Sequence, residues 1–291
     1  MVKKKLVKNA KKVDLFLINF LKKQKKSLLI MPMKYGVISG GKKIRSTIIL
    51  DAGKIFNINE HKLISICAAV ECIHSYSLIH DDLPCMDNDS MRRGKPSTHI
   101  KFGEASAVLA GSSLLTLAFE IISDKKFLIN SKIKTEIIRY LASCSGHTGI
   151  AGGQELDLKF ENKNKKINQI IDMQKKKTGK LFNFCLYAVG VIANKKSREK
   201  KFLSNLGEEI GVLFQLADDF LDKKGSSKLV GKLVKKDNKK GKSTLLNLMG
   251  EEKAYLYANN LQKKILRKLE KHGKKAKELI NTIKFILERK F

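Results

Sequence analysis

The sequence predicts an all-α fold, and three observations support this prediction. Apolar residues recur at the three-to-four-residue spacing of a buried helix face through most of the chain. Alternating apolar and polar runs bounded by hairpin turns, the pattern of strands, are scarce. Only three prolines occur in the 291 residues. Because neither a repeat nor a Pro/Gly-rich linker divides the chain, we expect residues 1–291 to form one domain of about ten or more helices.

The first half of the chain should form four helices. The first is amphipathic, because Asp14 and Asn19 interrupt its apolar stretch and no small-residue cleavage site of a secretion signal follows. It should end before Pro32. The second begins after a pair of glycines, and the third should end or kink at Pro84. The predicted ranges are 13–31, 43–56, 60–83 and 103–123.

The second half continues the same periodicity with longer helices. The segment Lys223–Ser243 is rich in Lys, Gly and Ser, and we expect a mobile basic loop there. The helix before that loop has no lysine from position 207 to 222, whereas the other polar faces of the chain are lysine-rich. The predicted ranges are 132–151, 165–193, 198–222, 243–247, 252–270 and 274–289.

The composition is that of a globular protein with an unusual charge. Hydrophobic residues make up 43% of the chain, and the formal net charge is +31. Of the 59 basic residues only seven are arginine, and the lysines are dispersed. A nucleic-acid surface should instead favour clustered arginine with interleaved aromatic residues. We therefore interpret the charge as lysine-rich solvated helix faces and expect no nucleic-acid partner.

The cysteines and the apolar runs indicate where the protein works. Five cysteines form no C-x-x-C pair, and their number is odd. Free thiols in a reducing cytosol are the expected state, so we predict a cytoplasmic protein. No apolar run approaches the length of a membrane span, and we expect no integral membrane segment.

One acidic cluster lies on a single helix. Gln215, Asp218, Asp219 and Asp222 are spaced i, i+3, i+4 and i+7, so they share one stripe of the predicted helix. The residues between them are apolar and require burial. Buried carboxylates need neutralising cations. A cluster of hard oxygen ligands suits Mg²⁺, which proteins usually hold with a few carboxylates plus substrate phosphates.

A second acidic cluster follows the same logic. His74 and Asp81 share a face of the helix over 60–83. Asp81 and Asp82 come at its C-terminal end, where the helix dipole is already negative, so a cation is needed there. The break at Pro84 should let Asp87 fold back toward Asp81. The sequence therefore predicts that these carboxylates form a second metal-binding cluster.

Cationic side chains accompany both acidic clusters. Arg92, Arg93 and Lys95 directly follow the cluster that ends at Asp87, and guanidinium groups bind phosphate oxygens bidentately. A second anion site is predicted after the glycine pair, where backbone N–H groups should be exposed and Lys42 and Arg45, at i and i+3, should face the same way. Recognition of diphosphate groups requires metal ligands with cationic side chains beside them, and this sequence has both.

These segments together resemble the trans-isoprenyl diphosphate synthases. The stretch A-A-V-E-C-I-H-S-Y-S-L-I-H-D-D-L-P-C-M-D-N-D-S-M-R-R-G-K-P-S-T-H (Ala68–His99) is similar to the family's first aspartate-rich region. The family's other motifs match, in order, G-G-K-K-I-R, G-G-Q-E-L-D-L (Gly152–Leu158), K-T-G-K-L (Lys177–Leu181) and F-Q-L-A-D-D-F-L-D (Phe214–Asp222). The similarity covers essentially the whole chain and is strongest to the bacterial members that make a fifteen-carbon product.

The resemblance implies a fold and a reaction. The fold would be helices around a deep central cavity, as in isoprenoid synthases, usually in a homodimer. An allylic diphosphate, first dimethylallyl and then geranyl diphosphate, would ionise with the help of Mg²⁺. The double bond of isopentenyl diphosphate would attack the carbocation, a proton would be lost, and farnesyl diphosphate would result. The resemblance implies three Mg²⁺ ions, with Mn²⁺ as the alternative metal.

Carried over residue by residue, the resemblance also implies site residues. The magnesium ligands would be Asp81, Asp82, Asp87, Asp218 and Asp222. The cations on the allylic diphosphate would be Arg92 and Lys177. Those holding isopentenyl diphosphate would be Lys42, Arg45, His74 and Arg93. Thr178 and Gln215 would line the path of the carbocation, and Lys232 and Lys242 in the basic loop would close over the leaving group.

Other readings stay open. A geranylgeranyl diphosphate synthase of the same family would differ in product alone. An inactive regulatory subunit of a heteromeric synthase should lose aspartates from one cluster, and both clusters are intact. A basic, helical nucleic-acid-binding protein would leave the aligned aspartates unexplained. A terpene cyclase would not need Lys42, Arg45 and His74. One departure from the family pattern is Ser46, which stands where a proline is common.

The sequence makes one prediction about product length. Tyr76 precedes Asp81 by five residues, about 7–8 Å along a helix. On the family pattern, an aromatic residue here forms the cavity floor and stops elongation at fifteen carbons. Tyr76→Ala should therefore lengthen the products toward twenty carbons, as measured by chromatography. An unchanged product profile would remove the chain-length argument.

Overall fold

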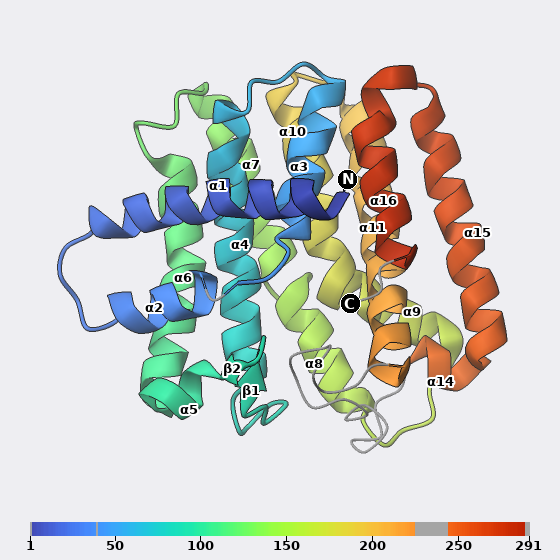
Figure 1. Cartoon of the computed structure of the whole chain (residues 1–291), viewed down its shortest axis with the longest axis horizontal. Helices are drawn as coiled ribbons and strands as arrows, with labels where there is room; N and C mark the ends of the chain where they lie inside the picture. Colours follow the sequence, from blue (N-terminus) through green and yellow to red (C-terminus); the bar gives the residue numbers. More distant parts are fainter. Residues whose placement is uncertain (1, 39, 225–243, 289–291) are drawn as a thin grey trace.

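The computed structural model describes residues 2–38, 40–224 and 244–288, and within them the predicted all-α fold class is confirmed. The described strands are two residues long, β1 (Met91–Arg92) and β2 (Lys95–Pro96), and they pair antiparallel. Figure 1 shows helices on all sides of the molecule and this small hairpin at one end.

The helices follow the order of the chain. They are α1 (Val2–Lys22), α2 (Ile30–Ile38), α3 (Ile44–Ile55), α4 (His61–Asp81), α5 (Thr98–Phe102), α6 (Glu104–Ser123), α7 (Ser131–Ser145), α8 (Ile150–Phe160), α9 (Ile167–Gln174), α10 (Lys180–Ile192), α11 (Ser197–Lys224), α14 (Leu245–Met249), α15 (Glu251–Glu270) and α16 (Lys277–Glu288). A π-helical turn, η1 (Lys175–Gly179), joins α9 to α10, and a 3₁₀ turn, η2 (Gly273–Ala276), precedes α16.

Three predicted boundaries are wrong. The range 13–31 is not one helix, because α1 begins at Val2 and ends at Lys22, before the polar stretch that separates it from α2. The range 132–151 breaks after α7, where a Cβ on Gly149 would lie 1.9 Å from the carbonyl oxygen of Cys144. The range 165–193 contains the π turn η1. Each break depends on contacts that periodicity does not report.

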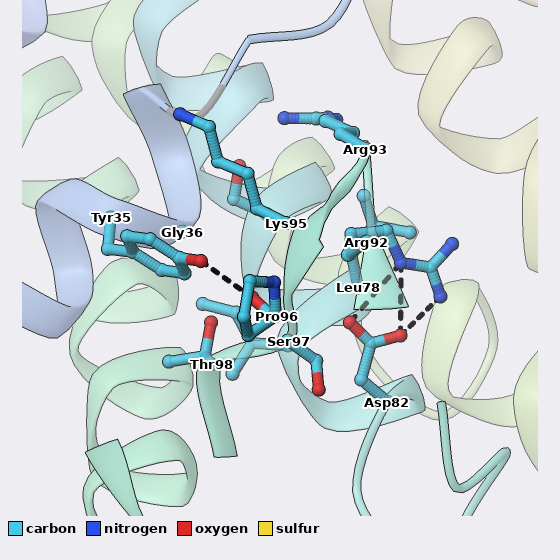
Figure 2. Close-up of a pocket in the computed structure, with 12 residues that line it drawn as sticks. Tyr35, Gly36, Leu78, Asp82, Arg92, Arg93, Lys95, Pro96, Ser97 and Thr98 are labelled. Atoms are coloured by element: carbon cyan, nitrogen blue, oxygen red, sulfur yellow. Dashed lines mark hydrogen bonds and ion pairs between the residues drawn. The ribbon is translucent and has the colours of Figure 1, made fainter. Parts of the chain in front are cut away.

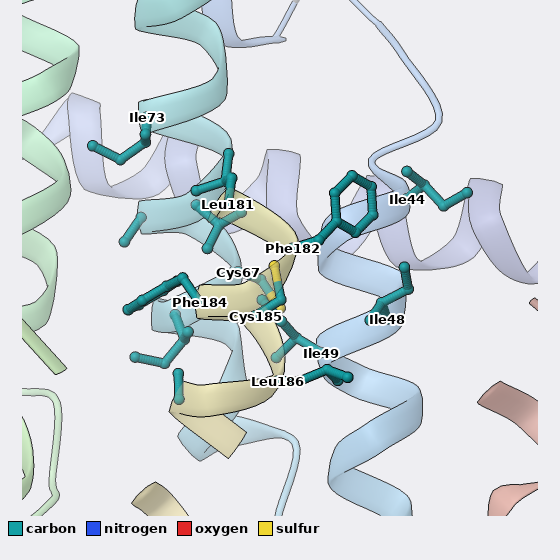
Figure 3. Packing of buried hydrophobic residues seen from close by; sticks show 14 of the residues in the cluster. Ile44, Ile48, Ile49, Cys67, Ile73, Leu181, Phe182, Phe184, Cys185 and Leu186 are labelled. Atoms are coloured by element: carbon teal, nitrogen blue, oxygen red, sulfur yellow. The ribbon is translucent and has the colours of Figure 1, made fainter. Parts of the chain in front are cut away.

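The core packs α3, α4 and α10 against one another (Figure 3). Ile48 and Ile49 of α3 and Phe182 and Phe184 of α10 all belong to this core, and all four are fully buried. Burial of such side chains contributes roughly 1.5–3 kcal/mol each. These three helices therefore provide a rigid support for the polar residues at their ends.

Glycines bring α11 close to α10. A Cβ on Gly207 would lie 2.3 Å from the carbonyl oxygen of Phe182, and a Cβ on Gly211 would lie 2.6 Å from the Cα of Gly179. Only glycine permits this backbone approach. The contact fixes the second half of α11, which carries the acidic stripe, against η1.

The two acidic motifs come to the same end of the molecule. Helix α4 ends at Asp81 and α11 at Lys224, and both C-terminal ends lie at the lower side of Figure 1, where the β1–β2 hairpin also lies. Lys232, Lys242 and most of the predicted basic loop fall outside the described residues.

Two described helices are long and apolar enough to meet the criteria for a membrane span. The most apolar 18-residue windows of α4 and α6 have mean hydropathies of 1.4 and 1.7. The expectation that no apolar run approaches that length is therefore wrong. In α4, 67% of the window is buried inside the protein, as in a core helix; in α6 the buried share is 44%.

Candidate active site

The cluster of Asp81, Asp82 and Asp87, here called the first acidic wall, lies at the end of α4 and in the chain that follows it. Asp81 is the last residue of α4, and Asp82 caps the helix. The chain then turns back, so that the N–H of Asp87 donates to the carbonyl of Asp81 at 2.8 Å. The N–H of Asp89 donates to the carbonyl of Asp82 at 3.1 Å. As predicted, the break at Pro84 folds Asp87 back onto the helix end.

Charge is concentrated at this wall. Burial raises the pKa of the Asp81 carboxyl to about 6; the positive charge of Lys177 opposes this shift, and the negative charge of Asp87 adds to it. Burial also raises the pKa of Asp82, against the opposing effect of Arg92. A divalent cation between these carboxylates would favour their charged forms and so oppose the rise in pKa that burial causes.

Arg92 is held by the first wall. Its Nε donates to both carboxylate oxygens of Asp82, at 3.0 and 3.2 Å, and its Nη2 forms an ion pair with the same carboxylate. Nη2 also contacts Asp89 Oδ2 at 3.3 Å. The sequence reasoning missed Asp89, although its position three residues before Arg92 is a signal that could have identified it.

A pocket that is partly open to solvent lies beside the wall (Figure 2). Arg92, Arg93 and Lys95 line it, and the Arg93 and Lys95 side chains extend toward the upper edge of the view. On its far side the hydroxyl of Tyr35 donates to the carbonyl of Pro96 at 2.6 Å, which ties the hairpin to α2. The pocket thus gathers the three cations that the sequence assigned to anion recognition.

The glycine-rich segment lies next to Arg93. Gly40 and Gly41 have φ of 96° and 98°, a left-handed region that favours glycine. A Cβ on Gly41 would lie 2.9 Å from Arg93 Cζ, and Arg93 Nη1 donates to the carbonyl of Gly40 at 2.8 Å. The absence of a side chain at Gly41 therefore makes room for the guanidinium group.

Lys42 and Arg45 do not lie on one helix. Helix α3 begins only at Ile44, so the exposed Lys42 lies before it. Between them, Lys43 is buried, with its Nζ 2.9 Å from the carbonyl of Val37 and 3.2 Å from Asp14 Oδ1. Lys42 and Arg45 therefore reach their surroundings from different backbone conformations.

Arg45 and His74 lie in the interior. The Arg45 guanidinium lies over the rings of Phe182, at 4.7 Å, and Phe214, at 5.6 Å, and its Nε has no hydrogen-bond partner within the described residues. Burial lowers the pKa of Arg45. Burial, followed by the positive charges of Arg45 and Arg93, holds the pKa of His74 well below its ordinary value. His74 is therefore a neutral imidazole at pH 7.

Glu71 is a buried anion among these cations that the sequence reasoning missed. It lies one turn before His74 on α4, is 2% exposed, and accepts a hydrogen bond from the hydroxyl of Ser46 at 2.7 Å. Its negative charge opposes the fall in the pKa of both Arg45 and Arg93. Ser46, the residue in place of the family's proline, therefore helps to satisfy a buried carboxylate.

The second acidic wall is the stripe on α11. Thr178 Oγ1 donates to Gln215 Oε1 at 2.9 Å, and Gln215 Nε2 donates to Asp219 Oδ1 at 2.9 Å. Gln174 Nε2 lies 3.4 Å from the other oxygen, Asp219 Oδ2. Both oxygens of Asp219 thus face amide groups.

Lys177 extends from the π turn toward Asp157. Its Nζ donates to Asp157 Oδ2 at 2.6 Å. A Cβ on Gly153 would lie 2.1 Å from the backbone nitrogen of Lys177, so this glycine allows α8 to touch η1. Asp157 belongs to the G-G-Q-E-L-D-L motif, but its pairing with Lys177 was not predicted. The positive charge of Lys177 also acts on Asp81, so Lys177 lies within electrostatic reach of the first wall.

The donor set fits magnesium bound together with a substrate. Within residues 2–38, 40–224 and 244–288, no three His, Cys, Asp or Glu side chains come close enough to hold a metal ion by themselves. The predicted ligands are carboxylates on two separate elements. Mg²⁺ favours such oxygen donors and keeps ligand positions for water and phosphate. A site of this kind is completed by a diphosphate rather than by protein alone.

Comparisons with known proteins agree with this geometry. The family model described as "Polyprenyl synthetase" matches residues 26–283. The farnesyl diphosphate synthase of Escherichia coli K12 is 41% identical over 80% of this chain and 79% of its own length. An FPP/GFPP synthase from Zymomonas mobilis superposes with a TM-score of 0.87 and 35% identity over 97% of both chains. A Helicobacter pylori geranyltransferase complexed with magnesium and isoprenyl diphosphate has a TM-score of 0.83 and 31% identity over 98% of this chain and 96% of its own.

The lowered pKa of His74 predicts how stability depends on pH. Its ordinary value is 6.5, so the unfolded chain binds a proton that the folded protein does not. Stability should therefore fall as the pH drops below about 6.5, by about 1 kcal/mol between pH 7.5 and 5.5 from this group. His74→Gln should remove this part of the pH dependence, as measured by urea unfolding at several pH values.

The matched control is His61→Gln, which changes an exposed histidine on the same helix. We expect this variant to keep the wild-type pH dependence. If His74→Gln also kept it, the buried, neutral state of His74 would be contradicted.

Proposed function

This chain belongs to the polyprenyl synthetase family, and we propose that it is a farnesyl diphosphate synthase, a prenyltransferase of isoprenoid biosynthesis. Its substrates would be isopentenyl diphosphate with dimethylallyl and then geranyl diphosphate. The observation that carries the proposal is the pair of acidic walls at the ends of α4 and α11, with diphosphate-binding cations beside them. A nucleic-acid-binding protein or an inactive regulatory subunit would not need both features.

The acidic walls would hold the metal. Asp81, Asp82 and Asp87 would contribute from the first wall, and Asp218 and Asp222 from the second. Magnesium, when bound, would neutralise the charge that develops on the departing diphosphate, an effect worth several kcal/mol. The magnesium and isoprenyl diphosphate in the Helicobacter pylori geranyltransferase support this role. We infer three ions, with Mn²⁺ able to replace Mg²⁺.

Cations on either side of the walls would orient the allylic substrate. Arg92 and Lys177 would exchange their present carboxylate partners, Asp82 and Asp157, for oxygens of the allylic diphosphate. The bond between C1 and the diphosphate oxygen then breaks, and the electron pair leaves with the diphosphate. Thr178 and Gln215, already hydrogen-bonded to each other, would line the path of the allylic cation with oxygen atoms.

A separate group of cations would bind isopentenyl diphosphate. Lys42, Arg45 and Arg93 would contact its diphosphate, and the neutral imidazole of His74 can donate a hydrogen bond. The substrate's double bond then attacks C1 of the cation, forming the new carbon–carbon bond, and loss of a proton restores a neutral hydrocarbon chain. Lys232 and Lys242, outside the described residues, would close over the leaving group and exclude water.

Two alternatives concern the product and the class of protein. The Zymomonas mobilis enzyme is described as an FPP/GFPP synthase, so product length varies among similar structures. The aromatic ring of Tyr76 favours the fifteen-carbon product over a geranylgeranyl product. Intact aspartates in both walls disfavour an inactive regulatory subunit, and they have no role in a nucleic-acid-binding protein.

The proposal predicts a metal-dependent synthesis. Purified protein given isopentenyl and dimethylallyl diphosphates with Mg²⁺ should form mainly a fifteen-carbon diphosphate, identified by chromatography of the alcohols after phosphatase treatment. EDTA should abolish the product. Asp222→Asn should lower kcat by about 100-fold or more, because one metal ligand is lost.

The control for that variant is Asp172→Asn, which removes a carboxylate that is 70% exposed on α9. It should leave kcat within about twofold, since exposed charges contribute little. Synthesis that continued in EDTA, or an Asp222→Asn variant as active as the control, would refute the proposed function.

We further propose a cytoplasmic homodimer. All five cysteines are free thiols and four are buried, as expected in a reducing compartment. The outer face of α6 exposes Val108 and Leu109, and Ile100 of α5 is also 56% exposed. An apolar face of this kind fits a second copy of the chain. Leu109→Glu should convert the dimer to a monomer in sedimentation analysis, and a monomeric wild-type protein would contradict this proposal.

A further inference from the structure

His80 and Tyr76 lie one helical turn apart on α4 and face the same way. Their ring centroids are 5.1 Å apart and their planes meet at 84°, the edge-on arrangement that aromatic pairs favour. Tyr76 is half-buried and packs against the hydrophobic core. The imidazole therefore supports one side of the phenol ring.

His80 is itself fixed by α6. Its Nε2 lies 3.0 Å from the carbonyl oxygen of Val108, and because a carbonyl can only accept, Nε2 carries the proton in this hydrogen bond. A Cβ on Gly111 would lie 2.3 Å from the same nitrogen and 2.5 Å from Cδ2. The imidazole thus occupies the space that any other residue at position 111 would fill.

We propose that His80 is a specificity-determining residue, which holds the Tyr76 ring across the end of the product cavity and thereby limits the product to fifteen carbons. This inference rests on the proposed function, because it assigns a role within the same synthesis. His80 acts through Tyr76 and is a positioning residue. Because His80 contacts Val108 and Gly111, helix α6 also contributes to setting the product length.

The physical reason is the rotamer freedom of Tyr76. The imidazole contacts the phenol ring edge-on and is itself held by α6 through the Val108 carbonyl. Removing the imidazole removes this contact and leaves the position beside Gly111 empty. An aromatic contact of this kind biases a conformational equilibrium by about two- to tenfold. The open rotamer, and with it a longer product, should become more populated.

The experiment measures the ratio of twenty-carbon to fifteen-carbon product from isopentenyl and dimethylallyl diphosphates with Mg²⁺. His80→Ala should raise this ratio at least about twofold over wild type. His80→Gln, which keeps an N–H donor for the Val108 carbonyl but lacks the ring, should raise it by at least about twofold. The glutamine variant keeps the test readable if the alanine variant folds poorly.

A double variant tests whether His80 acts through Tyr76. Tyr76→Ala alone should raise the ratio most, and adding His80→Ala to it should cause no further increase, since the held ring is already absent. His61→Ala, which removes an exposed histidine from the same helix, should keep the wild-type ratio. Thermal melts of each variant would show that the comparison concerns folded protein.

The outcomes separate the inference from the function on which it rests. If wild type forms no prenyl diphosphate, the proposed function fails. If wild type forms the fifteen-carbon product and Tyr76→Ala lengthens it, but both His80 variants keep the wild-type ratio, the function stands and the role of His80 is overturned. An additive increase in the double variant would also overturn it, because His80 would then act independently of Tyr76.

Discussion

The arrangement of the site depends on keeping several carboxylates of like charge partly out of water at one end of a helical protein. Burial raises the pKa of both Asp81 and Asp82, which means that their negative charges are unfavourable where they lie. Nearby groups offset part of this effect: Arg92 pairs with Asp82, and Lys177 with Asp157. These cations are the same groups that an anionic substrate would engage. A magnesium diphosphate would thus replace contacts that the free protein makes within itself.

Around Arg45, by contrast, positive charge is in excess. Arg45 and Arg93 share their surroundings with a histidine whose pKa is depressed and with one buried carboxylate, Glu71. The hydroxyl of Ser46 satisfies that carboxylate. Where the family commonly has proline, this chain has a hydrogen-bond donor, and the departure is consistent with the local charge balance. Helix α4 links both regions, since it carries Glu71 and His74 inside and Asp81 at its end.

In the proposed synthesis, the same helix would relate ionisation to product length. A carboxylate at the end of α4 and a ring five residues earlier are held at a fixed separation by helix geometry. How firmly the ring is held depends on another element, because His80 is bonded to α6 and fits beside Gly111. Since α6 also presents Val108 and Leu109 to the outside, the surface proposed for dimer contact and the support of Tyr76 share one helix.

The sequence by itself determined the helical class, both acidic clusters and the arginine pair. These signals are local: the stripe from Gln215 to Asp222 spans two turns, and Pro84 ends its helix through its own ring. Only the tertiary structure decided which charges meet. The pairs Lys177–Asp157, Ser46–Glu71 and Gln174–Asp219 join residues 20 to 45 positions apart, and burial and packing between helices set them. For the same reason the π turn before α10 and the early end of α1 did not follow from periodicity. Periodicity reports which face of a segment is buried, whereas these features depend on what lies against that face.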